Sequence, residues 1–487
     1  MPEPISQPNF QLFNTMSRAV EPLQPLDPQR VSLYVCGPTI YNYGHIGNFR
    51  TYIAVDLLRR ALRHFGYNVD HVMQFTDVDD KTIRGSRENN LPLGEFTAVY
   101  RKAFLDDART LNIELPAPDR LPNATDHIPE MVKLIEQLIA KGSAYVSDDG
   151  SVYFRIASFP KYGCLCHLDL SSLISGARVN QDEYEKEGVG DFVLWKKWMP
   201  ADGDVGWDSP WGKGRPGWHI ECSALSMEYL GKQIDIHGGG VDLRFPHHEN
   251  EIAQSEAATG LPFVGHWFHV EHLLVDGQKM SKSLKNMYTV RDVLARGYTG
   301  RELRYALLSG AHYSKNLNFT WQGMDDAKTA LARIDEWRKR IKSAAANVRE
   351  EDKDLVSSNL ESAVNTTLSS DLNVISPSRA LQDNLNINDA LGILFTWIRI
   401  SNKSLDEGKL NPLQAYAYSK AWDAFDAVLG LGDATVSIPS EVQALVDQRA
   451  EARKAKDFAK SDELRKAIDA LGWKVKDTAK GQELSPL

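Results

Sequence analysis

A pattern of strand, loop, helix and strand near the N-terminus constrains the fold of this chain more than any other feature. The β-rich run 31–35 ends at Cys36, and after a glycine-containing loop the apolar residues between 49 and 66 recur at spacings of three and four, as in an amphipathic helix. A second apolar run covers 69–75. This βαβ unit predicts an α/β fold with a parallel sheet. Such sheets bind ligands at the carboxyl ends of their strands, where Cys36 and Thr76 would lie.

Composition excludes several classes of protein. The chain has 487 residues, 42% of them hydrophobic and 25% charged, and no apolar run approaches the roughly 18 residues that span a bilayer. Residues 1–10 lack the basic and apolar regions of a secretory signal. Four cysteines in so long a chain suit a reducing compartment better than a disulfide scaffold. We therefore expect a cytoplasmic protein with no membrane-bound part.

The net charge of −9 gives no overall basic footprint of the kind that nucleic-acid binders show. Any contact with RNA would have to use a local patch. The stretch 449–476 contains nine Lys and Arg residues that could form one, although a solvated helix face would have the same composition.

Two segments have the residues to bind a polyphosphate. His45-Ile46-Gly47-Asn48 precedes the predicted helix, where free backbone N–H groups and the helix dipole favour anions. A second segment, which we call the lysine loop, is Lys279-Met280-Ser281-Lys282-Ser283. It follows a predicted turn at Asp276-Gly277 and would present two ammonium groups. The first string is short enough to recur by chance, and an exposed Lys/Ser loop is the alternative for the second. Together, in this order, the two resemble the signature pair of class I aminoacyl-tRNA synthetases.

Further segments resemble the cysteinyl-tRNA synthetase family in particular. They are Cys36-Gly-Pro-Thr39, Phe75-Thr-Asp-Val-Asp-Asp-Lys81, Gly217-Trp-His-Ile-Glu-Cys222, Asp235-Ile-His-Gly-Gly-Gly240 and Phe245-Pro-His-His-Glu-Asn-Glu-Ile-Ala-Gln-Ser255. The resemblance implies a Rossmann-like parallel-sheet catalytic domain in two halves, with an insertion, followed by an α-helical bundle and a small C-terminal domain. The expected ranges are 1–121 and 214–270 for the two halves, 122–213 for the connective insertion, 271–320 for the lysine loop and stem-contact region, 321–432 for the helical bundle and 438–487 for the anticodon-binding segment.

In that family the residues that match Cys36, Cys222, His247 and Glu251 hold zinc beside the aminoacyl pocket, so the resemblance implies one Zn²⁺ per chain. From spacing alone the four identify no metal site, although His247 and Glu251 would share one helix face, and either cysteine could be a small core residue. Zinc prefers thiolate to hydroxyl and could therefore select cysteine over serine. Four protein ligands ordinarily complete the coordination of zinc, and the sequence does not show how such a site could also bind the substrate thiolate.

The resemblance assigns roles to the neighbouring positions as well. Thr76 and Trp218 match residues that line the cysteine pocket, whereas His219 and His248 stay ambiguous. The residues that match the catalytic and ATP-binding groups are His45, Gly47, Asn48, Gly238, Gly239, Gly240, Asp242, Lys279 and Lys282. A separate cluster in the insertion, Cys164-Leu-Cys166-His167, has the spacing of metal ligands but lies outside the motifs of the family.

Two positions depart from the family pattern. Asn48 stands where the first motif normally ends in histidine; its amide can still donate to phosphate but carries no charge. Lys285 stands where a glycine usually follows the lysine loop, so this position loses backbone freedom and gains a charge. Neither departure removes Lys282.

The expected function is that of a cysteine–tRNA ligase, which uses L-cysteine, ATP with Mg²⁺, and tRNA(Cys), and which we expect to be a monomer. One alternative is a ligase that transfers activated cysteine to an amino sugar; such enzymes lack the C-terminal RNA-binding part. Another is a non-catalytic regulator that binds zinc and RNA and has no need of Lys282.

Overall fold

The computed structural model describes residues 10–168, 191–281, 283–358, 377–432, 440–455, 457–471, 473–478 and 481–486. The chain divides into two compact units, Met1–Leu431 and Gly432–Leu487. Within the described residues, no helix is both long enough and apolar enough to cross a membrane.

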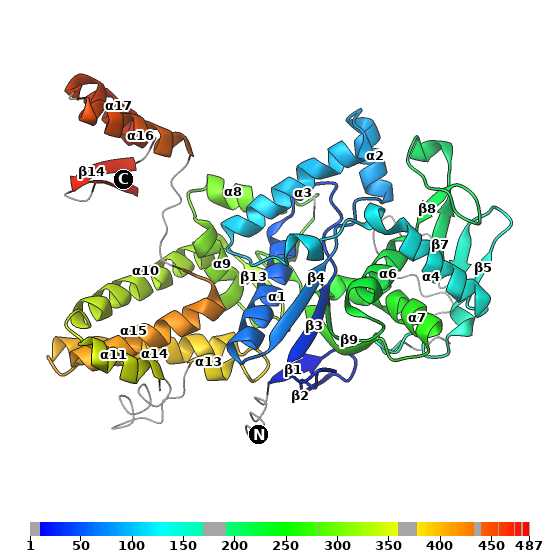
Figure 1. Cartoon of the computed structure of the whole chain (residues 1–487), viewed down its shortest axis with the longest axis horizontal. Coiled ribbons are helices and arrows are strands. Elements are labelled where there is room, and N and C mark those ends of the chain that lie inside the picture. The colour runs from blue at the N-terminus through cyan, green and yellow to red at the C-terminus, as the bar shows by residue number, and fades with distance from the viewer. Residues whose placement is uncertain are drawn as a thin grey trace. The chain divides into compact units, whose positions relative to one another are not determined.

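A four-stranded parallel sheet forms the centre of the first unit (Figure 1). Its order is β10 (Val264–Val270), β9 (Ile234–Gly240), β3 (Arg30–Val35) and β4 (Asn68–Met73). The helix that joins β3 to β4, α1 (Ile46–His64), buries an apolar face in the core, so the predicted βαβ unit and α/β class are confirmed. The carboxyl ends of the three strands β3, β4 and β9 share one edge, because Val35 at the end of β3 pairs with Met73 at the end of β4 and with Gly238 near the end of β9.

A second, antiparallel sheet interrupts the parallel one in sequence. Its order is β5 (Ala144–Val146), β6 (Val152–Phe154), β7 (Phe192–Lys197) and β8 (Gly214–Pro216), and β5 and β6 form the predicted hairpin. Strand β8 pairs with β7, so this sheet continues into the first residues of the range expected for the second half of the catalytic domain. Two helices then lead back to the parallel sheet, α6 (Trp218–Leu230) and α7 (His247–Thr259).

The remaining elements of the first unit surround these sheets. The helices before the insertion sheet are α2 (Asp80–Glu88), α3 (Leu93–Thr110) and α4 (Ile128–Ala140), and the N-terminal hairpin is β1 (Gln11–Asn14) with β2 (Ala19–Pro22). Short 3-10 helices occupy Pro118–Arg120, Ala124–His127, Ile156–Ser158, Pro200–Asp202 and Val241–Arg244 (η5). A three-stranded sheet of β11 (Leu273–Val275), β12 (Gln278–Lys279) and β13 (Leu317–Phe319) follows, with α8 (Val290–Ala295) and α9 (Gly300–Ser309).

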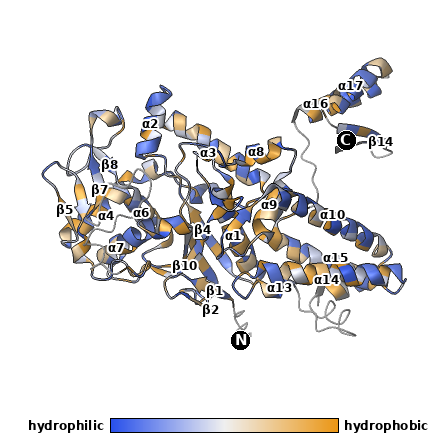
Figure 2. Ribbon diagram, turned by 180° about the vertical axis from the view of Figure 1, so that it is seen from behind, coloured by the Kyte–Doolittle hydropathy of each residue, from blue (hydrophilic) through white to orange (hydrophobic). Residues whose placement is uncertain are grey.

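Between β13 and Gly430 the described residues are largely helical, as the sequence predicts. The helices are α10 (Trp321–Ala344), α11 (Glu350–Ser358), α13 (Pro377–Ala380), α14 (Ile387–Asp406) and α15 (Pro412–Leu429). Trp337, Trp397 and Trp422 are fully buried between them. The hydrophilic residues of α10 dominate the face seen in Figure 2, because its apolar residues recur at three and four and point into the bundle.

The C-terminal unit differs from the single charged helical segment expected over 441–471. It has two helices, α16 (Ser440–Lys454) and α17 (Phe458–Ala470), because Asp457 caps the start of α17 through a bond from Lys460 N–H. A hairpin of β14 (Trp473–Thr478) and β15 (Gly481–Pro486) follows, which the sequence pattern did not reveal. Arg449, one of the nine basic residues of the candidate RNA patch, is buried and bonded to Asp477, so it is not part of an exposed patch. The linker predicted at 433–439 lies outside the described residues.

Candidate active site and metal centre

Three elements bring the four predicted metal ligands together. Cys36 follows β3, Cys222 lies on α6, and His247 and Glu251 lie one turn apart on α7. All four residues are buried, and one ligand atom of each lies within 4.8 Å of the others. The expected shared face of His247 and Glu251 is therefore present, because residues 247–259 do form a helix.

The distances between these atoms suit a tetrahedral zinc site. Zinc bonds of about 2.3 Å to sulfur and about 2.0–2.1 Å to nitrogen or oxygen place tetrahedral ligand atoms about 3.3–3.8 Å apart. Cys36 Sγ lies 3.7 Å from Cys222 Sγ and 3.7 Å from Glu251 Oε1. His247 Nε2 lies 3.4 Å from Cys222 Sγ and 3.1 Å from Glu251 Oε1. The donor set and its spacing therefore fit the ion that the sequence resemblance implies.

Burial controls the protonation of these ligands. It raises the pKa of Cys222 to about 11 and holds the pKa of Cys36 well above the usual thiol value. It also holds the pKa of His247 well below the usual imidazole value, so His247 is neutral, the form that ligates metals. A buried thiolate is unfavourable without a compensating cation, so the two thiols would release their protons to solvent only when a metal ion binds.

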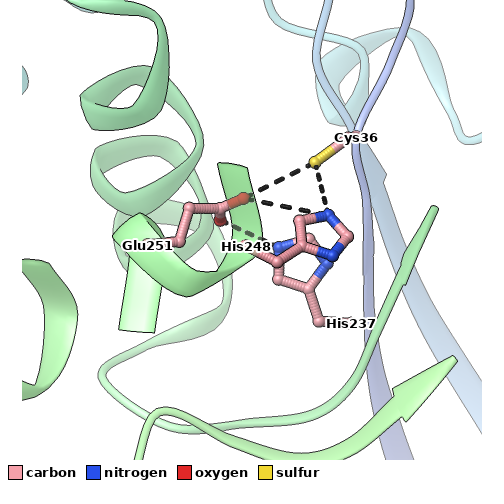
Figure 3. A group of neighbouring side chains, drawn as sticks. All are labelled: Cys36, His237, His248 and Glu251. Atoms are coloured by element: carbon pink, nitrogen blue, oxygen red, sulfur yellow. Dashed lines mark hydrogen bonds and ion pairs between the residues drawn. The ribbon is translucent and has the colours of Figure 1, made fainter. Parts of the chain in front are cut away.

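Two more histidines contact the same centre (Figure 3). His237 Nε2 lies 2.9 Å from Glu251 Oε2, and His248 Nε2 lies 3.4 Å from Cys36 Sγ. Cys36, His237, His248 and Glu251 thus make a second group of converging ligand atoms. The sequence leaves His248 ambiguous and indicates no role for His237. The sequence does hold one indication for His237, because it lies near the carboxyl end of a predicted strand. In the structure this strand, β9, places His237 beside Tyr34 of β3.

The first phosphate segment caps α1. His45 is the N-cap residue, and its Nδ1 accepts from Asn48 N–H at 3.2 Å while Asn48 Oδ1 accepts from His45 N–H at 3.0 Å. The neutral His45 ring therefore carries its proton on Nε2. Burial lowers the pKa of His45 despite the nearby Asp242 carboxylate, which raises it, so this ring acts as a neutral donor at pH 7.

The second phosphate segment follows the predicted turn. Asp276 and Gly277 have φ values of 49° and 75° and connect β11 to β12, which ends at Lys279. Asn286 closes the loop, since its Oδ1 accepts from Ser281 N–H at 2.8 Å and its Nδ2 donates to the carbonyl oxygen of Lys279 at 3.2 Å. Lys282 lies outside the described residues.

The two phosphate segments meet. Ile46 N–H donates to the carbonyl oxygen of Tyr288 at 2.8 Å, so the chain just after the lysine loop is bonded to the start of α1. A Cβ on Gly47 would collide with the Met280 methyl group. An alanine at this position would require the end of the Met280 side chain to move and would lie 3.0 Å from His45 Nδ1, so glycine allows the loop to pack closely here.

The predicted substrate residues lie beside the ligands. Thr76 is fully buried and donates to Glu221 Oε2 at 2.8 Å, and the Trp218 ring lies 4.1 Å from the His247 ring, centroid to centroid. The glycines Gly238, Gly239 and Gly240 end β9, and Asp242 follows in η5. A Cβ on Gly240 would meet the Asp242 carboxylate, so a larger residue there would displace that side chain.

The cysteines of the insertion do not form a comparable group. Among the described residues, no cluster of three or more convergent metal-ligand atoms includes Cys164, Cys166 or His167. The segment 163–166 surrounds Glu249 instead, whose carboxylate accepts backbone N–H bonds from Leu165 at 3.1 Å and Cys166 at 3.2 Å. The loop is thereby attached to α7, the helix that carries two of the four predicted metal ligands.

Comparison with known proteins identifies the class of protein first. The family described as tRNA synthetases class I (C) catalytic domain matches residues 22–329. The solved methionyl-tRNA synthetase of Mycobacterium tuberculosis with bound methionyl-adenylate shares the fold: its TM-score is 0.61 over 84% of this chain and 92% of that chain, at 16% identity. This chain is therefore an enzyme of the class I aminoacyl-tRNA synthetases, a ligase.

The sequence relatives then identify the particular family. The family described as cysteinyl-tRNA ligase anticodon binding domain matches residues 435–484. The cysteine–tRNA ligases of Protochlamydia amoebophila (strain UWE25) and Chlamydia pneumoniae are 46% and 47% identical to this chain; each match covers 98% of this chain and, respectively, 97% and 98% of the relative. The chain belongs to the cysteine–tRNA ligase family.

Proposed function

We propose that this enzyme activates L-cysteine with ATP to cysteinyl-adenylate and pyrophosphate, and then transfers the cysteine to the 3′-terminal ribose of tRNA(Cys). The observation that carries the proposal is the convergence of two buried thiols, an imidazole and a carboxylate at the carboxyl edge of the parallel sheet. Such a donor set suits a soft-ligand metal centre.

The proposed ligands are Cys36, Cys222, His247 and Glu251. This group has two thiols, whereas the group with His237 and His248 has one, and zinc favours thiolate ligands. Zinc held there would take the substrate thiolate as a further ligand, which a serine hydroxyl could not match. Thr76 and Trp218 would line the pocket for the rest of the amino acid.

The phosphate residues would act on ATP by position and charge. His45 would donate its Nε2–H to a phosphate oxygen, and Asn48 its side-chain amide. Lys279 and Lys282 would stabilise the negative charge that builds on the phosphates as the cysteine carboxylate attacks the α-phosphorus, with Mg²⁺ on the leaving pyrophosphate. The Gly238–Gly240 turn and Asp242 would hold the adenosine.

The C-terminal unit favours tRNA as the acceptor over an amino sugar. The match of residues 435–484 to an anticodon-binding domain supports this choice, as does the nearly full-length similarity to cysteine–tRNA ligases. A non-catalytic regulator would have no use for the contacts that join the lysine loop to the start of α1.

Two measurements test the proposal. The first is cysteine-dependent exchange of labelled pyrophosphate into ATP, with serine as the control; the second is charging of tRNA(Cys). We expect both activities with cysteine. Exchange without charging would leave the amino-sugar ligase, and the absence of exchange would leave the non-catalytic binder.

A further inference from the structure

The side-chain amide of Gln74 points at one of the proposed zinc ligands. Gln74 follows β4 and is 1% exposed. Its Nε2 donates to Cys222 Sγ at 3.0 Å. Its Oε1 accepts from the backbone N–H of Gly37 at 3.0 Å and from the Tyr34 hydroxyl at 3.1 Å. All the polar atoms of this buried side chain therefore have partners, and one partner is a ligand sulfur.

Gly37 determines which way the amide faces. A backbone N–H can only donate, so the atom opposite it must be the amide oxygen, and the amide nitrogen must then face the sulfur. The chain after β3 is also built around Gln74, because a Cβ on residue 37 would collide with the Gln74 carbonyl oxygen. The backbone N–H of Gly37 thus fixes the orientation of the Gln74 amide, so that its N–H group faces Cys222 Sγ.

A hydrogen bond to this sulfur changes what the centre can do. Two thiolates and one carboxylate carry more negative charge than a divalent ion neutralises, and this excess opposes the approach of another thiolate. Hydrogen bonds from the surroundings withdraw charge from a coordinating sulfur and alter the electronic properties of the metal.

We propose that Gln74 is a positioning residue that determines specificity: its N–H reduces the electron donation of Cys222 to the metal and so keeps the metal able to accept the thiolate of the cysteine substrate. This inference rests on the proposed function. It explains how four protein ligands can leave the ion receptive to one more.

A cobalt-substituted protein provides the test. Full-length protein, Gln74→Met and Gln74→Leu are loaded with Co²⁺, and the sulfur-to-cobalt charge-transfer band is recorded. Loss of the N–H raises the energy of the sulfur lone pairs, so we expect the band to move to longer wavelength in both variants. The zinc-loaded variants should show a KM for cysteine about tenfold higher in pyrophosphate exchange, with a smaller change in kcat and in the KM for ATP.

Gln254→Met is the matched control. Gln254 is equally buried, but its Nε2 donates to Ser223 Oγ at 2.8 Å and to the carbonyl oxygen of His219 at 3.0 Å, not to a sulfur. We expect its charge-transfer band and its KM for cysteine to match those of the unmodified protein.

The outcomes separate the two proposals. An unmodified protein without cysteine-dependent exchange would overturn the proposed function. An active unmodified protein, together with metal-loaded Gln74 variants whose band and KM are unchanged, would overturn this inference alone. The same holds if both Gln74 variants fail to retain cobalt while Gln254→Met retains it, because Gln74 would then be needed to build the site rather than to tune it.

Discussion

Met280 lies directly against Gly47, so the lysine loop touches the segment that caps α1. In the sequence these residues belong to two separate motifs. In the fold they form one contact, and the hydrogen bond from Ile46 to Tyr288 holds the same two segments together. ATP binding is therefore expected to depend on how closely the loop packs, as well as on the charges it carries.

Gly47→Ala should impair adenylate formation. The added methyl group would displace the end of the flexible Met280 side chain and would lie 3.0 Å from His45 Nδ1, so the His45 ring would have to shift. A displacement of about 1 Å can cost about 10²-fold in rate, so we expect kcat for pyrophosphate exchange to fall at least tenfold. Gly94→Ala, on α3, is the control, since nothing lies within 4 Å of the added group. Equal activity of the two variants would contradict this account of Gly47.

Lys285→Gly should stabilise the protein. Lys285 has a φ of 52°, a left-handed conformation that costs a non-glycine residue about 1–2 kcal/mol. Glycine removes that strain but adds about 0.4–1 kcal/mol of entropy to the unfolded chain, so we expect a net gain of about 0.5–1 kcal/mol in the free energy of unfolding. Urea unfolding measures it. Lys285→Ala keeps the strain and should show no gain; a gain as large as that of glycine would assign the effect to the lysine charge.

Cys222→Ser should lose zinc and cysteine activation together. A hydroxyl is a poor substitute for a thiolate on zinc, and the Gln74 amide would lose its sulfur partner. Metal content and the KM for cysteine are the measurements. Cys166→Ser, in the insertion, should change neither. Loss of zinc with an unchanged KM for cysteine would refute the proposed binding of the substrate thiolate to the metal.

His219→Leu should weaken metal binding by about 10- to 100-fold. His219 Nδ1 lies 2.9 Å from His247 Nδ1. With Nε2 of His247 on a metal, its Nδ1 must carry the proton and donate it to His219, which fixes the ring and its tautomer. Competition with a zinc chelator gives the affinity. His266→Leu, at a buried histidine of β10, serves as the comparison; equal weakening by both would argue against a specific role for His219.

Acid should destabilise the protein through His71. Burial lowers the pKa of His71 to about 3, whereas histidine in an unfolded chain titrates near 6.5. The folded state resists protonation of His71. The stability that the neutral ring contributes is therefore fully present above pH about 6.5 and is lost as the pH falls towards 3. Between pH 7.5 and 5.5 it should lower the free energy of unfolding by about 1.4 kcal/mol. Urea unfolding of His71→Leu should show a free energy of unfolding that lacks this part of the pH dependence. An unchanged pH dependence would contradict the role given to His71.

Local pattern was sufficient to predict the parallel sheet and α1. The spacing of apolar residues over 49–66 reports a helix face, and the turn at Asp276-Gly277 follows from the freedom of glycine. The C-terminal hairpin was not predicted, because the alternation of Trp473-Lys474-Val475-Lys476 covers only four residues and its partner strand, Gly481–Pro486, has no apolar alternation to pair with it. The burial of Arg449 could not be predicted from the sequence, because its partner, Asp477, is brought to it only by the fold.

The sequence by itself determined which chemical groups are available: two phosphate-binding segments, and four residues that resemble a zinc site. Only the tertiary structure decided how they act. Gln74 and Cys222 are 148 positions apart, and His237 meets Glu251 only because α7 folds back against β9. Spacing along a chain reports contacts within a helix or hairpin, whereas contacts between distant segments are set by the packing of a shared core.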